Sequence, residues 1–228
     1  MAASSPDVHG EVNGKSVQDR LIEAAEDLLC RRGFNETSVR DIAAAAGCNV
    51  ASVNYYFGGK ESLYLEIWRR RLAQMRETRL ASINKVMSAE GQPQLEDLLR
   101  SYAGSFLEPL VGGHAHCRFI NLMAREMIDP HLPRDMFVTE MVVPVMAAMG
   151  DALRRICPSL SKADARLTIL SVVGQLMHTV CAKGMFEESH HPEVPKVDVE
   201  ELVEHVVRFS AAGIRACAER TARMREGQ

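Results

Sequence analysis

Apolar residues recur every three to four positions along most of the chain, a pattern typical of amphipathic helices. The first of these helices begins near Ser16 and ends at Gly33, because glycine favours a helix end. The pattern predicts further helices at 38–46, after Asn49, from Lys60 to about Met87, and at 94–110, 117–128, 133–156, 162–185 and 197–224. No segment alternates apolar and polar residues between hairpin turns, so the sequence predicts an all-α fold.

The stretch 33–61 has the pattern of a helix-turn-helix. Thr37 is expected to be the N-cap of its first helix. The inner face of that helix consists of Val39, Ile42, Ala43 and Ala46. Gly47 supplies the turn, where we expect a left-handed backbone. Val53 and Phe57, four residues apart, are the inward anchors of the second helix.

The outward face of the second helix is small and polar at its start and aromatic at its end. At 100° per residue, the positions that turn away from the two anchors are Ala51, Ser52 and Tyr55, flanked by Asn54 and Tyr56. Such a helix can enter a major groove and offer short polar groups to base edges and tyrosine hydroxyls to phosphates. The alternative is a helical corner with tyrosines on its surface.

At these residues the sequence resembles the DNA-binding domain of the TetR family of bacterial transcriptional regulators. The family pattern runs T-S/T-V-R-D-I-A, then a glycine turn, then Y-x-Y/H-F-x-x-K-E, and it is matched by Thr37–Ile42, Gly47 and Asn54–Glu61. Asn54 departs from the pattern, since tyrosine is commonest there. The resemblance implies a transcriptional repressor that binds a palindromic operator as a homodimer and is released by a small-molecule effector.

The resemblance also implies the residues that contact DNA. Those facing bases or sugars are Ala51, Ser52, Asn54 and Tyr55, and those fixing phosphates are Thr37, Arg40, Tyr56 and Lys60. A cap at Thr37 would lie beside free helix N–H groups, and Lys60 opens the next helix, so both positions favour an anion. For Arg40, the alternative is a surface salt bridge with Glu36 or Asp41.

The helix pattern and the resemblance together predict three parts along the chain. Residues 1–15 are polar and are expected to form a disordered leader, 16–62 form the DNA-binding domain, and 63–228 form a helical regulatory and dimerisation domain. The helix from about residue 60 links the two domains.

The net charge is −3, yet residues 15–79 carry 11 Lys and Arg against 9 Asp and Glu. The run Arg69–Arg71 is expected to be solvated helix surface, because consecutive residues point 100° apart.

The regulatory part is rich in methionine and carries a few polar groups within apolar helices. Arg125, Glu126 and Met127, followed by Pro130, resemble an R-E-M-x-x-P pattern of the CecR-like subgroup of the TetR family. A buried Arg125 or Glu126 needs a partner, and we expect a structural ion pair, with a bound effector as the alternative. The candidate residues for a partly apolar effector are Phe119, Met123, Glu126, Met127, Gln175 and His178.

The last two predicted helices, 162–185 and 197–224, carry broad apolar stripes interrupted by small residues. Stripes of this kind suit a four-helix bundle with two helices from each of two chains, as the TetR resemblance also implies. Burial within one chain is the alternative and could account for part of each stripe. Pro144 should kink or divide the earlier helix at 133–156.

Other classes of function find little support in the sequence. No nucleophile elbow, phosphate-binding glycine loop or HExxH motif occurs, so a metal-dependent helical enzyme and a non-DNA-binding adaptor are the weaker alternatives. His114, His116 and Cys117 lack a second ligand pair, and we expect neither a metal nor a cofactor. Six widely spaced cysteines and the lack of a long apolar segment predict a cytoplasmic protein with reduced thiols and no membrane partner.

Overall fold

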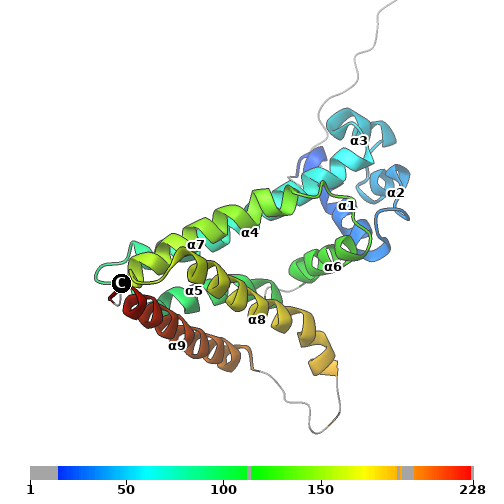
Figure 1. Ribbon diagram of the computed structural model, residues 1–228. Helices are drawn as coiled ribbons and strands as arrows, with labels where there is room; N and C mark the ends of the chain where they lie inside the picture. The colour runs from blue at the N-terminus through cyan, green and yellow to red at the C-terminus, as the bar shows by residue number, and fades with distance from the viewer. Residues whose placement is uncertain (1–14, 112–113, 189–190, 192–197, 227–228) are drawn as a thin grey trace, which may run out of the picture. The chain divides into compact units, whose positions relative to one another are not determined.

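The computed structural model describes residues 15–111, 114–188, 191 and 198–226 (Figure 1). Its elements are α1 (Val17–Arg32), α2 (Val39–Ala45), α3 (Val50–Phe57), α4 (Lys60–Met87), α5 (Leu95–Val111), α6 (His114–Ile128), the π-helix η1 (Val138–Val142), α7 (Val143–Ile156), α8 (Lys162–Glu188) and α9 (Val199–Glu226). No strand occurs within these residues, and the predicted all-α fold is confirmed. Nearly all of the predicted leader, 1–15, lies outside the described residues.

The chain forms two compact units that do not follow chain order. The first contains the described residues up to Arg71 together with 114–133, and the second contains 72–113 and the residues from Arg134 onward. Helix α4 therefore contributes its first half to one unit and its second half to the other. Helix α6 lies in the same unit as the helix-turn-helix, although the sequence placed it among the regulatory residues.

The first unit is built on α1, which packs against α2, α3 and α6. Ser16 caps the start of α1 by accepting a hydrogen bond from the amide of Asp19, and Gly33 ends the helix with a φ of 88°. The apolar core of this unit includes Leu21, Ala25, Leu29, Ile42, Ala43, Val53, Leu63, Ile67, Trp68 and Leu122. The core thus fixes the two short helices of the helix-turn-helix on the long α1.

The second unit is a helical bundle in which α5 packs against α8 and α9, and α8 packs against α7 and α9. Its buried apolar residues include Leu72, Ile83, Leu98, Tyr102, Met149, Leu153, Ile169, Leu176, Val206 and Ile214. Arg215 on α9 pairs with Glu96 on α5 at 2.6 Å. Buried residues on one side of α8 and α9 confirm that part of their predicted stripes is absorbed within the chain.

Pro144 divides the helix predicted at 133–156, as expected. Proline has no backbone N–H, so it cannot bond to the carbonyl of Glu140 four residues earlier. The chain there forms the π-helix η1, and α7 follows with Pro144 in its first turn. Nη1 of Arg76 donates to the Glu140 carbonyl at 2.8 Å. An arginine of α4 therefore bonds to the carbonyl to which Pro144 cannot donate.

Candidate nucleic-acid interface

Helix α2 begins with a capping box, and the capping residue is Ser38. Its hydroxyl accepts from the amide of Asp41, and the Asp41 carboxylate accepts from the Ser38 amide at 3.0 Å. The Ser38 hydroxyl also donates to the Asp41 carboxylate, and this bond, together with the one from the Ser38 amide, holds the pKa of Asp41 below its usual value. The predicted cap at Thr37 is wrong, because the Thr37 side chain is buried and its hydroxyl donates to the Gly33 carbonyl at 2.8 Å. Thr37 instead ties the loop after α1 back onto that helix.

The turn between α2 and α3 has the conformation that the sequence predicts. Gly47 has a φ of 62°, in the left-handed region that a side chain disfavours. Asn49 is the N-cap of α3 and accepts from the amide of Ala51 at 2.9 Å. Gly58 ends α3 with a left-handed φ of 78°. Two glycines and one asparagine thus set where the second helix starts and stops.

The predicted reading face of α3 is exposed within this unit. Val53 is fully buried and anchors the helix. Ala51, Asn54 and Tyr55 are exposed, and Ser52 and Tyr56 are partly exposed. Tyr55 is 79% exposed, and its ring contacts that of Tyr56 edge to face at 4.9 Å. The helix therefore exposes small side chains at its start and an amide and two phenols toward its end.

The two candidate phosphate cations have different surroundings. Arg40 is exposed and forms no ion pair within the described part of the chain, so the alternative salt bridge to Glu36 or Asp41 is not observed. Lys60 is half-buried, and its ammonium donates to the carbonyls of Phe34 and Thr37 at 3.0 and 3.1 Å. It also lies over the Phe34 ring. Lys60 thus fixes the loop before α2 and retains one further N–H.

The Arg69–Arg71 run is exposed at Arg69 and Arg70, as expected, but Arg71 is partly buried. Arg71 forms a two-pronged ion pair with Glu26, a residue of α1 that is almost fully buried. Arg70 bonds to Glu66 at 2.9 Å and to Asp19 at 3.1 Å. The pairs with Glu26 and Asp19 join α4 to α1, and the buried pair made by Arg71 holds the helix-turn-helix in place.

The end of α6 is bonded to the end of α1 and to the start of α4. Arg125 donates to the carbonyls of Cys30 and Arg31 at 2.8 and 2.6 Å, in the last turn of α1 where helix carbonyls are unsatisfied. The Glu126 carboxylate accepts from the Tyr64 hydroxyl at 2.6 Å. It also accepts from two backbone amides just beyond α6.

The predicted ion pair involving Arg125 and Glu126 is therefore wrong. The sequence places the two residues next to each other, but successive positions on a helix point in different directions. Arg125 faces the carbonyl end of α1, which attracts a cation, and Glu126 faces a hydroxyl and two amides, which suit an anion. Each residue thus finds a separate partner within the first unit.

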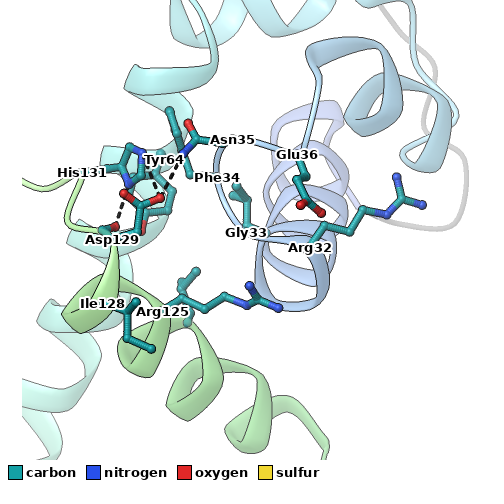
Figure 2. A pocket seen from close by; sticks show the side chains of 12 residues that line it. Arg32, Gly33, Phe34, Asn35, Glu36, Tyr64, Arg125, Ile128, Asp129 and His131 are labelled. Atoms are coloured by element: carbon teal, nitrogen blue, oxygen red, sulfur yellow. Dashed lines mark hydrogen bonds and ion pairs between the residues drawn. The ribbon is translucent and has the colours of Figure 1, made fainter.

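A pocket of about 260 Å³ lies beside these contacts. Figure 2 shows Phe34, Tyr64 and His131 together on one side of it. The centres of the Phe34 and His131 rings lie 4.3 Å apart. The Asn35 amide donates to the Asp129 carboxylate at 2.9 Å. It marks the seam where the loop before α2 meets the end of α6.

The six predicted effector residues fall in both units. Met123, Glu126 and Met127 belong to the first, whereas Gln175 and His178 lie on α8 in the second. The side chain of Phe119 lies outside the described residues. Met127 is 77% exposed, whereas Leu122 on the same helix is buried. Gln175 donates to the Ser210 hydroxyl on α9 at 3.5 Å.

The described residues offer neither a metal-binding cluster nor a membrane-spanning helix. No group of three or more His, Cys, Asp or Glu there could hold a metal ion. The side chains of His114, His116 and Cys117 lie outside that part of the chain. None of the described helices has both the length and the apolar character needed to cross a bilayer.

Several residues that build the interface escape sequence reasoning. Phe34 contacts Lys60, Tyr64 and His131, residues that lie far from it in the chain. Its place directly after the helix-ending Gly33 is the one local signal. The Glu26–Arg71 pair spans 45 residues and leaves no signal in local patterning. Such long-range partners become visible in the folded unit alone.

A capped short helix, a left-handed glycine turn and a second helix with an exposed polar and aromatic face define a helix-turn-helix DNA-binding protein. Family comparison agrees: residues 21–67 match the family of bacterial regulatory proteins named after tetR, and 87–213 match the tetracyclin repressor-like C-terminal domain. The second match alone covers more than half of the chain. The protein belongs to the TetR family.

Relatives support this placement over different lengths. The probable HTH-type transcriptional regulator YttP of Bacillus subtilis is 25% identical over 191 residues, which are 82% of this chain and 90% of that protein. The HTH-type transcriptional dual regulator CecR of Shigella flexneri is 46% identical over 54 residues, 24% of each chain. The structure of the regulator FadR from Bacillus subtilis in complex with stearoyl-CoA has a TM-score of 0.65 at 18% identity, covering 86% of this chain and 98% of that one.

Membership of the family settles the class of activity. The protein is a DNA-binding transcriptional regulator of the helix-turn-helix type and not an enzyme. The family combines DNA binding through its N-terminal domain with the binding of small-molecule effectors. The metal-dependent enzyme and the adaptor without DNA binding, which the sequence left open, are excluded.

Proposed function

We propose that the protein is an effector-released repressor that binds a palindromic operator as a homodimer. The observation that carries the proposal is the exposed face of α3, which lies between two glycine turns. Each subunit places this helix in the major groove of one half-site, and the half-sites lie about one helical turn, or a multiple of it, apart. Operator binding requires both subunits, because each offers few cations.

Direct readout is assigned to the exposed start and middle of α3. Ala51, Ser52, Asn54 and Tyr55 face bases or sugars, and the Asn54 amide is suited to a bidentate bond with adenine. Arg40, Tyr56 and Lys60 hold phosphates. Arg40 is supported by its lack of a carboxylate partner among the described residues. Thr37 keeps a positioning role through its bond to Gly33.

The homodimer is proposed to form through α8 and α9. Exposed residues follow one face of α8 at helical spacing: Leu167, Leu170, Ser171, Gly174 and His178. A similar exposed stripe on α9 consists of His205, Phe209, Ala212, Gly213 and Ala216. A Cβ added at Gly174 or Gly213 would meet no atom within 4 Å, so neither glycine is required by packing within the chain. Large exposed apolar residues beside small ones suit a close helical partner.

The effector is proposed to be a partly apolar small molecule bound by the residues predicted from the sequence. Similarity to CecR and to a FadR with stearoyl-CoA supports a place near the CecR-like subgroup and an apolar component in the effector. Glu126 is the exception to test, because its carboxylate already accepts from one hydroxyl and two amides. Calorimetry with Glu126→Ala decides whether the effector needs it.

Two further parts of the proposal concern organisation. Residues 16–62 form the DNA-binding domain and 63–228 the regulatory and dimerisation domain, in functional terms that the family matches support. On this division, the α6 residues belong to the regulatory domain by function but to the first unit by their contacts. A regulator of this kind acts on chromosomal DNA, so we place it in the cytoplasm.

The proposal is tested by selecting bound DNA from a random pool with the purified full chain. A palindrome with two equal half-sites supports it, and a gel shift with the selected DNA should be lost in Tyr56→Ala. A single unrepeated site, or no enrichment, would contradict it. Size-exclusion chromatography of the same sample reports the dimer independently.

A further inference from the structure

Arg79, in the second half of α4, is buried within the second unit and is 4% exposed. Its guanidinium lies 4.2 Å from the centre of the Phe106 ring on α5. Nη1 lies 3.2 Å from Sδ of Met141 in η1. Tyr102, also buried on α5, lies close enough for the two charges to influence each other. The guanidinium is thus surrounded by an aromatic face, a phenol and a thioether.

No carboxylate pairs with Arg79 among the residues that the structure describes. Burial lowers the pKa of Arg79, and Tyr102 is the one group that opposes this effect. A buried cation is unfavourable unless it is paired and hydrogen-bonded, and a thioether sulfur is a weak acceptor. Other arginines on α4, such as Arg70 and Arg71, do have carboxylate partners. The described neighbours of Arg79 therefore offset only part of the free-energy cost of burying its charge.

The segment facing Arg79 is also unusual in its backbone. Met141 belongs to the π-helix η1, and π-helical turns in proteins occur frequently at functional sites. Methionine is flexible, so its side chain can yield to an incoming group. Arg76, one turn earlier on α4, bonds to a carbonyl of the same segment. A cation without an acid and a π-helix that presents a displaceable thioether thus meet at one place.

We propose that Arg79 binds the carboxylate of the regulatory effector, which is an apolar molecule carrying one carboxylate group. The carboxylate replaces the Met141 sulfur and forms a two-pronged bond with the guanidinium. Phe106 and Met141 contact the adjoining apolar part of the molecule. The inference rests on the proposed function, because it names the chemical class of the effector of that regulator.

The alternative is a purely structural arginine stabilised by the Phe106 ring. The two alternatives predict opposite effects of an apolar replacement on the ligand-free protein. A structural arginine makes Arg79→Met less stable. An arginine kept for an anion makes the Arg79→Met protein as stable as the wild type or more so, because the buried charge is removed.

The experiment uses the full chain and probes that share a ten-carbon tail: decanoate, 1-decanol and decyltrimethylammonium. Calorimetry measures their binding to the wild type, Arg79→Met, Arg79→Gln and Arg76→Met. Arg76→Met is the matched control, because it removes a guanidinium that contacts the same π-helix through a backbone carbonyl. Thermal unfolding of each ligand-free protein gives the second readout.

The wild type and Arg76→Met should bind decanoate at least about 10-fold more tightly than either other probe. Arg79→Met and Arg79→Gln should lose that preference, and Arg79→Met should unfold at no lower temperature than the wild type. A wild type that binds no probe or shows no preference, a preference that survives in the Arg79 variants, or a less stable Arg79→Met overturns the inference. Operator binding measured without any probe tests the proposed regulator itself. Failure of the effector inference is therefore distinguishable from failure of the proposed function.

Discussion

The hydroxyl of Tyr64 on α4 donates to Oε2 of Glu126 on α6 across 2.6 Å. Oε1 of the same carboxylate accepts from the amides of His131 and Leu132. One side chain therefore ends α6, fixes the loop that follows and attaches both to α4. Since all of these residues lie in the unit that contains α2 and α3, the contact helps to set the position of the DNA-reading helix.

Replacing Tyr64 by phenylalanine should reduce the free energy of unfolding by about 1.5–3 kcal/mol, the range for a hydrogen bond to a charged group. Burial and the bond to Glu126 raise the pKa of Tyr64 well above its ordinary value of 10.0. The folded state therefore favours the neutral phenol, and its contribution is present below about pH 10 and is lost as the pH rises above that value. Measured by urea unfolding from pH 8 upward, the free energy of unfolding should fall more steeply with pH in the wild type than in Tyr64→Phe.

Tyr55→Phe is the matched control, because Tyr55 is exposed on α3. It should change neither the free energy of unfolding nor its slope with pH. Equal slopes for the wild type and Tyr64→Phe would show that the bond to Glu126 does not hold α6 in solution.

Ser38→Ala should destabilise the protein by about 1 kcal/mol through loss of the α2 cap. It should also reduce the sensitivity to acid. The bonds from Ser38 lower the pKa of Asp41, so their contribution is present above the unfolded value near 3.8 and is lost as the pH falls through the folded value. Thr37→Ala, which removes a buried bond but not the cap, should keep the acid sensitivity of the wild type. If Thr37→Ala reduced the acid sensitivity and Ser38→Ala left it unchanged, Thr37 and not Ser38 would be the cap of α2.

Arg71→Met should cost about 3–5 kcal/mol of stability, because it leaves the buried Glu26 carboxylate without its partner. The double variant Glu26→Met with Arg71→Met should recover much of that loss. Arg70→Met, which breaks exposed pairs, should cost at most about 1 kcal/mol. Chemical denaturation measures all three. A similar cost for Arg70→Met and Arg71→Met would argue against the special role of the buried pair.

Leu170→Asp and Phe209→Asp should each convert the dimer into a monomer and abolish operator binding while leaving the helical content unchanged. Burying one such side chain in the interface stabilises the dimer by roughly 1.5–3 kcal/mol. Each residue occurs twice in a symmetric interface, so a substitution acts at two places. Analytical ultracentrifugation gives the mass. Val143→Asp is the control, since Val143 is an exposed apolar residue outside α8 and α9. A dimer that persists in both α8 and α9 variants would place the interface elsewhere.

Much of the fold follows from local signals, and the helix-turn-helix follows most closely. Glycines at 33 and 47 act on their immediate neighbours, so the helix ends can be predicted. Of the two predicted inward anchors of α3, Val53 is buried and Phe57 is only partly so. The cap at Ser38 is missed by one position because threonine and serine both suit a cap. Packing of Thr37 against Gly33 decides between them.

The partners of the charged residues could not be predicted from sequence. Arg125 and Glu126 are adjacent in the chain, yet one bonds to α1 and the other to α4 and the loop beyond α6. Arg79 looks in sequence like any other basic residue of a long helix. Its burial beside Phe106 and Met141 depends on how α4, α5 and η1 pack. Tertiary packing alone carries this information.

The central claim, that the exposed face of α3 reads bases while Arg40 holds a phosphate, is tested most directly by fluorescence anisotropy with the selected operator and single-base variants over a range of salt concentrations. Asn54→Ala should weaken operator binding by about 1–3 kcal/mol and relax the preference at one base pair in each half-site. Arg40→Ala should weaken all sequences about equally and lower the salt dependence by about one unit per subunit. Unchanged sequence preference in Asn54→Ala, together with an unchanged salt dependence in Arg40→Ala, would contradict the account.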